Sequence, residues 1–274
     1  MAGSFLDKLF GKKPAKDSPD PATATGGEGE QPPTPKLDAD VHEKACQDTQ
    51  AAMDRHWSGI GQVETDVIAY LIPPAFQGGP AWPTIRQAYR VVRRPGSIII
   101  ATDGMSDPYD DDSGENGFGM ELFIETADIP AEFAGTSGNV ADLKHSWAFE
   151  MLEHLAGMIA RSGGIRDRLE EIGSMSSETP GVSESHAVAA QVPDRFKSAD
   201  DSIGVLFGLP KPDFPDLVED TPFRPVRLVP VVVITAAELE FVRAGGPDAR
   251  HDLVERLAAL PSGHRSDLKR DSVI

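Results

Sequence analysis

Apolar residues recur at helical spacing in two long segments of the chain. Residues 38–60 place apolar side chains on one approximately helical stripe, with Asp40 as a candidate N-cap. The clearest stripe lies in residues 139–164, where Trp147 shares one face with its apolar neighbours and a pair of glycines ends the segment. Both patterns predict amphipathic helices, and Trp147 is expected to be a core residue.

A capping box predicts a further helix near the C-terminus. Thr235 and Glu238 stand at the two ends of the sequence Thr-Ala-Ala-Glu, so each side chain can bond the backbone of the other residue. This helix is expected to end near residue 244, because two glycines follow. A last helix is expected over residues 248–260, where apolar residues again recur at helical spacing.

Two strands and an acidic loop between them are predicted from residues 97–126. Residues 97–102, Ser-Ile-Ile-Ile-Ala-Thr, form a short β-branched run bounded by turn residues, which is typical of a buried strand. From residue 117 onward, side chains alternate so that Phe118 and Glu121 face opposite sides. This alternation predicts a half-buried strand. The loop at 103–116 would then join two strands of one sheet.

The other segments predict a mixture of short strands and irregular structure. Further strands are expected at 67–72, 203–208 and 227–235. Pro230 lies inside the last of these and lacks a backbone donor, which favours an edge strand or a bulge. Residues 78–94 are expected to be helical or irregular, and residues 173–200 to form a loop. Without a regular βαβ rhythm, the order favours an α+β fold with mixed or antiparallel sheets packed against helices.

Composition divides the chain into three parts. Residues 1–37 are rich in Pro, Gly, Thr and charge, which predicts a disordered tether. A short amphipathic helix around Phe5 and Phe10 is the alternative to a frayed chain start. Residues 38–260 are expected to fold as one domain, and residues 261–274 to form a polar tail.

Charge and cysteine content exclude several classes of function. The 274 residues carry 26 Lys+Arg against 44 Asp+Glu, a formal net charge of −18. Such a charge opposes binding to nucleic acid or to an anionic membrane and favours basic partners. Cys46 is the single cysteine, so no internal disulfide can form, which suits the cytoplasm. No stretch approaches the ~18 consecutive apolar residues of a membrane helix.

Acidic side chains are concentrated in one block. From Pro95 through Leu143 there is no Lys, Arg or His, whereas this stretch contains eleven acidic residues. A surface of this sign attracts basic proteins, although it can equally serve solubility alone. The residues expected to contact a protein partner lie in the loop and in the strand after it: Asp103, Ser106, Asp107, Tyr109, Asp110, Asp111, Asp112, Glu115 and Glu121.

The acidic loop matches no established metal or nucleotide motif. An EF-hand register with a glycine at its sixth position fails at the acidic positions. Residues 117–122, Gly-Phe-Gly-Met-Glu-Leu, lack the third glycine of a dinucleotide fingerprint. Nucleophile and zinc-protease motifs are also missing, so we expect no catalytic residue, metal or cofactor. The alternative is a metal-dependent or hydrolytic enzyme that uses the acids of 103–115.

Four segments in order resemble the suppressor of fused domain. They are the first strand with its turn (97–108), the Gly-Phe-Gly-x-Glu-Leu strand (117–126), the Trp-bearing helix (146–163) and the late strand that leads into Thr-x-x-Glu-Leu (228–242). The resemblance covers about residues 60–260. The chain departs from the animal pattern at 98–100, where aromatic residues are usual, and at Met120, and it lacks the long C-terminal regulatory region.

The resemblance implies an α+β domain without known catalytic activity that works by holding other proteins. The animal member sequesters a transcription factor, whose peptide adds as a β-strand. Bacterial members are commonly associated with immunity to polymorphic toxins. We therefore expect a cytoplasmic interaction protein of the toxin-immunity kind or another sequestering regulator, with a basic toxin or effector as its partner.

Overall fold

The computed structural model describes residues 36–210 and 214–274. The tether predicted for 1–37 lies outside these residues except for its last two positions. The helices are α2 (Ala39–Ile60), α3 (Ala131–Ala134), α4 (Trp147–Arg161), α5 (Arg166–Ile172), α6 (Ala187–Gln191) and α7 (Ala236–Ala258). The strands are β1 (Gln62–Val63), β2 (Ile68–Ala69), β3 (Ala88–Arg94), β4 (Ser97–Asp103), β5 (Met120–Thr126), β6 (Met175–Pro180), β7 (Ser202–Phe207), β8 (Leu217–Val218) and β9 (Val226–Ile234).

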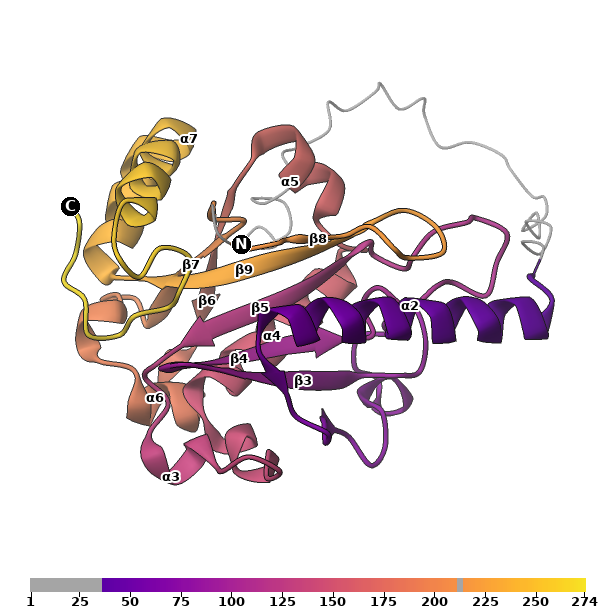
Figure 1. The fold of residues 1–274 in the computed structure, drawn as a ribbon. Coiled ribbons are helices and arrows are strands. Elements are labelled where there is room, and N and C mark those ends of the chain that lie inside the picture. The colour runs from indigo at the N-terminus through magenta and orange to yellow at the C-terminus, as the bar shows by residue number, and fades with distance from the viewer. Residues whose placement is uncertain (1–35, 211–213) are drawn as a thin grey trace, which may run out of the picture.

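One mixed sheet, with nine strands among the described residues, organises the fold. Its main order is β1-β3-β4-β5-β9-β7-β6, while β2 pairs with β3 and β8 pairs with β9. The pairing of β5 with β9 is parallel, and the other pairings are antiparallel. The helices pack on this sheet (Figure 1), which confirms the predicted α+β class.

Helices cover both faces of the sheet. On β9, Val229, Val231 and Val233 belong to the same apolar cluster as Trp147 of α4. The alternate residues face the other way, where α2 covers the first half of β9 and α7 covers the second half. Figure 1 shows α2 and α4 on opposite sides of the strands. A strand between two helical layers must bury both of its faces.

The burial of β5 corrects the prediction of a half-buried strand. All of its residues are buried, although they alternate between the two faces as expected. Leu122 and Ile124 pack on the α4 side, and Phe123 packs under α2 with Trp57. The sequence could not reveal the second covering layer, because α2 lies about sixty residues earlier in the chain.

Three other predictions of secondary structure are wrong. Residues 78–94, expected to be helical or irregular, end in strand β3, and residues 173–200, expected to form a loop, begin with β6. Pro230 lies in a central strand, not at an edge. On the β7 side, however, the paired residues of β9 begin only at Val231. Pro230 has no backbone N–H to donate toward β7. Because it lies just beyond the last β7–β9 pair, the sheet tolerates this missing hydrogen bond.

The helix ends mostly follow the sequence. Thr235 and Glu238 form the predicted capping box of α7, whose helical geometry breaks at Gly246, as the glycine pair predicted. The cap of α2 is Asp38, whose side chain accepts from the Asp40 amide, and not Asp40 itself. In the described part of the chain, no helix is both long and apolar enough to span a bilayer.

The segment 261–274, expected to be a polar tail, packs against the body. Ser266, Leu268 and Arg270 are buried. The Ser266 amide donates to the Glu125 carbonyl of β5 at 2.9 Å, and the Leu268 amide donates to the Asp128 carboxylate at 2.8 Å. Polar groups of this segment find their partners on strand β5, on the residues after it and on helix α7, so its polarity does not make it a free tail.

Candidate protein-binding site

Four of the predicted partner-binding residues lie inside the protein. Asp103, Ser106, Asp107 and Glu121 are each at most 3% exposed. The structure therefore does not present these four side chains to a partner, which corrects their assignment as contact residues. Their polar atoms are bonded within the protein, and together they hold the loop that begins after β4.

Arginines on and before β3 bind the two buried aspartates. Arg86 donates to Asp103 at 3.0 Å and to Asp107 at 2.9 and 3.0 Å, and Arg90 donates to Asp103 at 3.2 Å. Burial raises the pKa of Asp103, but the two guanidinium groups outweigh this effect and hold its pKa below the ordinary value. The sequence shows these arginines just before the acidic block, and their proximity could have indicated the pairing.

Glu121 shapes the first turn of the loop. Its carboxylate accepts from the Thr102 hydroxyl at 2.5 Å, the Gly104 amide at 3.1 Å, and the Ser106 amide and hydroxyl at 2.9 and 2.6 Å. Burial raises the pKa of Glu121, and the nearby Asp103 carboxylate adds to this rise. Gly104 has a φ of 138°, and a Cβ there would lie 2.5 Å from the Arg86 carbonyl oxygen. Only glycine fits this turn.

The other five predicted residues form an acidic rim at the surface, comprising Tyr109, Asp110, Asp111, Asp112 and Glu115. Asp110 and Asp112 are exposed, and the other three are half-buried. The loop is fixed to α2 where a ring nitrogen of His42 bonds the Pro108 carbonyl at 3.0 Å. On the other side, Arg224 pairs with Glu115 at 3.4 Å. Three adjacent aspartates are thus held at the surface.

Two residues of the chain itself, Lys36 and Leu37, lie on the acidic rim. Lys36 forms an antiparallel bridge with Asp111, and the Leu37 amide donates to the Asp110 carbonyl at 3.1 Å. The Lys36 ammonium pairs with the Asp110 carboxylate at 2.7 Å, which lowers the pKa of Asp110. From the sequence, Lys36 and Leu37 were expected to belong to the disordered tether, and no contact between them and the loop was predicted. The rim therefore accepts both an extended backbone and a lysine side chain.

One long edge of the sheet has no neighbouring strand. β6 pairs with β7 on one side, and among the described residues no strand pairs with its other side. Its alternate backbone groups point outward, as in any edge strand, and offer the pattern that an added strand would use. Among the described residues, β6 is thus an edge strand of the sheet.

The acids of the loop are not gathered around one point. Asp103 and Asp107 are turned toward arginine, while the rim residues face solvent. Among residues 36–210 and 214–274, no group of three or more His, Cys, Asp or Glu side chains could hold a metal ion. No contact in this part of the structure favours the enzyme alternative.

Asparagine in place of Asp103 is expected to lower the free energy of unfolding by about 1–3 kcal/mol at neutral pH, because Arg86 and Arg90 lose a charged acceptor. The difference in free energy of unfolding between wild type and variant should become smaller as the pH falls through the native pKa of Asp103. That pKa lies below the unfolded value of about 3.9, so the wild-type advantage is complete above that value and lost in acid. Urea denaturation at several pH values measures both effects. A difference in stability that stays constant down to strong acid would contradict the pairing of Asp103 with Arg86 and Arg90.

Comparison with known proteins identifies the family. The family model described as suppressor of fused protein (SUFU) matches residues 87–270, which is more than half of the chain. No curated protein matches the sequence. The matched region begins at the strand that carries Arg90 and extends into the packed C-terminal segment. Suppressor of fused domains are protein-interaction and regulatory modules. The chain therefore belongs to the suppressor of fused protein family.

Proposed function

We propose that this protein is a non-catalytic binding module that holds an extended basic segment of a partner protein against the acidic rim. The observation that carries the proposal is the contact of Lys36 and Leu37 with Asp110 and Asp111. This contact combines a backbone bond with a lysine–aspartate pair, which are the two interactions that strand addition of a basic peptide would use. A partner segment would take the place of these two residues.

The net charge supports a basic partner. The net charge of −18 and the three adjacent surface aspartates attract a cationic protein, which raises the association rate. Within its family, the role that suits these properties is immunity to a bacterial toxin, with a basic toxin such as a nuclease held in the cytoplasm. The immunity role makes its own prediction. The partner recovered with the wild-type protein from its native cells has to be a basic, toxic protein, and recovery of an acidic or harmless one would reject that role.

Replacing Asp110, Asp111 and Asp112 together by lysine is expected to slow association with the partner about ten-fold or more at low salt, because the field that steers a cation is reversed. Raising the ionic strength should shrink the difference between variant and wild type, since salt screens exposed charges. Folding should change little, because solvent-exposed charges contribute little stability. The measurement is the association rate against salt concentration.

A matched control variant distinguishes the effect of the rim on association from the effect of net charge. Lysine at Asp248, Glu255 and Asp271 changes the total charge by the same amount at exposed positions on or near α7. This control variant should associate much faster at low salt than the rim variant. Equal association rates for the rim variant and the wild-type protein at low salt would leave the rim as a solubility feature and reject the binding proposal.

A further inference from the structure

A pocket lies at the opposite end of β4 from the acidic loop. It opens between the β3–β4 turn, strand β5, the last residue of α7 and the segment 260–265 after it, and its volume is about 560 Å³. Ligand pockets in proteins commonly span about 300–1,000 Å³. β4 separates the pocket from the loop by six residue steps, or roughly 20 Å. This pocket is therefore a separate site from the acidic rim.

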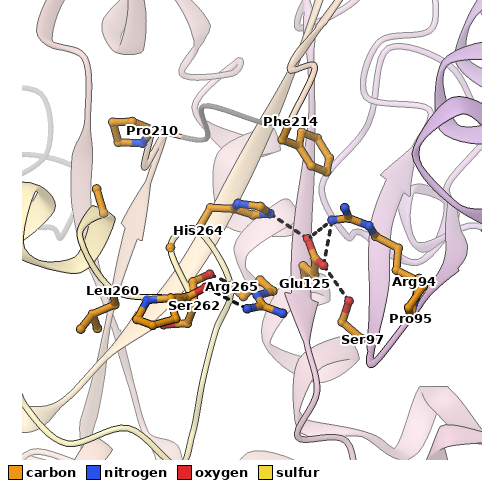
Figure 2. A pocket seen from close by; sticks show the side chains of 13 residues that line it. Arg94, Pro95, Ser97, Glu125, Pro210, Phe214, Leu260, Ser262, His264 and Arg265 are labelled. Atoms are coloured by element: carbon orange, nitrogen blue, oxygen red, sulfur yellow. Dashed lines mark hydrogen bonds and ion pairs between the residues drawn. The ribbon is translucent and has the colours of Figure 1, made fainter.

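One buried carboxylate lies at the floor of the pocket, and its bonding capacity is filled. Glu125 is 1% exposed and accepts from Arg94 at 2.9 Å through both oxygens, from the Ser97 hydroxyl at 2.7 Å, and bonds a ring nitrogen of His264 at 2.7 Å. Figure 2 shows Arg94 and His264 reaching Glu125 from opposite sides. Burial raises the pKa of Glu125, but these bonds and the Arg94 charge hold it below its ordinary value.

The pocket is cationic in a protein that is strongly acidic. Among its described lining residues Glu125 is the single acid, whereas Arg94 and Arg265 are both basic. Arg94 binds Glu125 through Nη1, and its Nε and Nη2 make no bond within residues 36–210 and 214–274. Arg265 donates Nε and Nη2 to the carbonyls of Ser262 and Pro261, and its Nη1 is likewise unbonded in that part of the chain. These guanidinium nitrogens can therefore donate to an acceptor on a ligand.

The pocket also has an apolar wall. The Phe214 ring is buried and stacked on Phe123 at 5.0 Å, with the Arg94 guanidinium 5.9 Å and the His264 ring 5.1 Å from its centroid. Leu260 and Pro95 line other parts of the cavity (Figure 2). Guanidinium groups pair well with carboxylate or phosphate, and an apolar group is favoured where it covers apolar side chains such as Leu260 and Pro95.

We propose that this pocket binds a small organic anion. Its carboxylate or phosphate is held by Arg94 and Arg265, and its apolar part lies against Leu260 and Pro95. Glu125 is not a ligand group here. It fixes the guanidinium of Arg94 in place, so that the donors of Arg94 that remain are oriented before the anion arrives.

Four probes test the proposal by NMR titration of the full chain at constant ionic strength. Phenyl phosphate and benzoate carry both a ring and an anion, inorganic phosphate carries only the anion, and benzamide carries only the ring. The two ring anions are expected to bind with Kd of about 1 mM or tighter, and the other two at least about ten-fold more weakly. The better of the two ring anions distinguishes a phosphate ligand from a carboxylate ligand.

Two variants locate the binding in the pocket. Arg265→Gln is expected to weaken phenyl phosphate binding about ten-fold, because a charged donor is lost. Arg256→Gln is the matched control, since this arginine is exposed and pairs with Asp252 outside the pocket. Ala258→Trp fills the cavity without removing charge and should abolish binding. The proposal is overturned if no ring anion shows saturation by about 10 mM, if inorganic phosphate binds as tightly as phenyl phosphate, or if Arg265→Gln behaves like Arg256→Gln.

Discussion

Replacing Trp147 by alanine is expected to lower the free energy of unfolding by about 3–5 kcal/mol, as large-to-small changes in a core do. The side chain is fully buried in the cluster that joins α4 to the sheet. Its indole nitrogen donates to the Asp128 carbonyl at 3.2 Å. Alanine would leave both a cavity and a carbonyl without its donor. The shift of the denaturant midpoint measures the loss.

Ile85→Ala provides the control for this prediction. Ile85 is an apolar residue that is 68% exposed, so its truncation should change stability by no more than about 0.5 kcal/mol. The loss of stability for Trp147→Phe should lie between those for Ile85→Ala and Trp147→Ala, because phenylalanine keeps an aromatic ring but lacks the indole N–H donor. If Trp147→Ala unfolded at the wild-type midpoint, the packing of α4 against the sheet would be wrong.

Replacing Arg270 by methionine is expected to cost about 3–5 kcal/mol, because it leaves a buried carboxylate without its cation. Arg270 donates to Glu238 through both terminal nitrogens at 2.6 Å. The Glu238 side chain is 0% exposed and that of Arg270 is 6% exposed. Glu238 belongs to the first turn of α7, whereas Arg270 lies in the segment that was expected to be a polar tail. The loss would show that this segment is part of the folded domain.

The pH dependence of the Arg270→Met variant gives a second readout. Burial raises the pKa of Glu238, but the bonds and charge of Arg270 outweigh burial and hold its pKa below the ordinary value. The contribution of the pair is therefore complete above the unfolded pKa of about 4.3 and is lost as the pH falls through the native pKa. The variant should approach the wild type in acid. Arg55→Met, at an exposed arginine, should leave stability nearly unchanged.

Elements with a strong local signal were predicted well from the sequence. The β-branched run before Asp103 forms β4, the apolar stripe around Trp147 forms α4, and the Thr-Ala-Ala-Glu box caps α7. In each case residues within a few positions of one another determine the element, through the pleat of a strand, the turn of a helix or the bonds of a cap. The order of these motifs also indicated the family correctly.

Strand β3 was missed although its partner strand β4 follows it after a turn of two residues. Arg90, Arg93 and Arg94 make the segment look polar, yet each pairs with a carboxylate outside β3. Arg90 pairs with Asp103 on β4, and Arg94 pairs with Glu125 on β5. An arginine that is neutralised in this way can lie in a strand of a covered sheet. The segment 88–94 by itself does not show which carboxylate each arginine meets.

By itself, the sequence determined the main strands and helices, the fold class, the family and the presence of an acidic block, because periodicity, capping and charge are properties of neighbouring residues. Tertiary structure alone decided which acids are accessible. Asp103, Asp107 and Glu121 are buried because arginines and turn donors converge on them, whereas Asp110 and Asp112 remain exposed beside Lys36. Burial of a charge depends on the partners that folding brings together, and only the tertiary structure shows which donors meet each carboxylate.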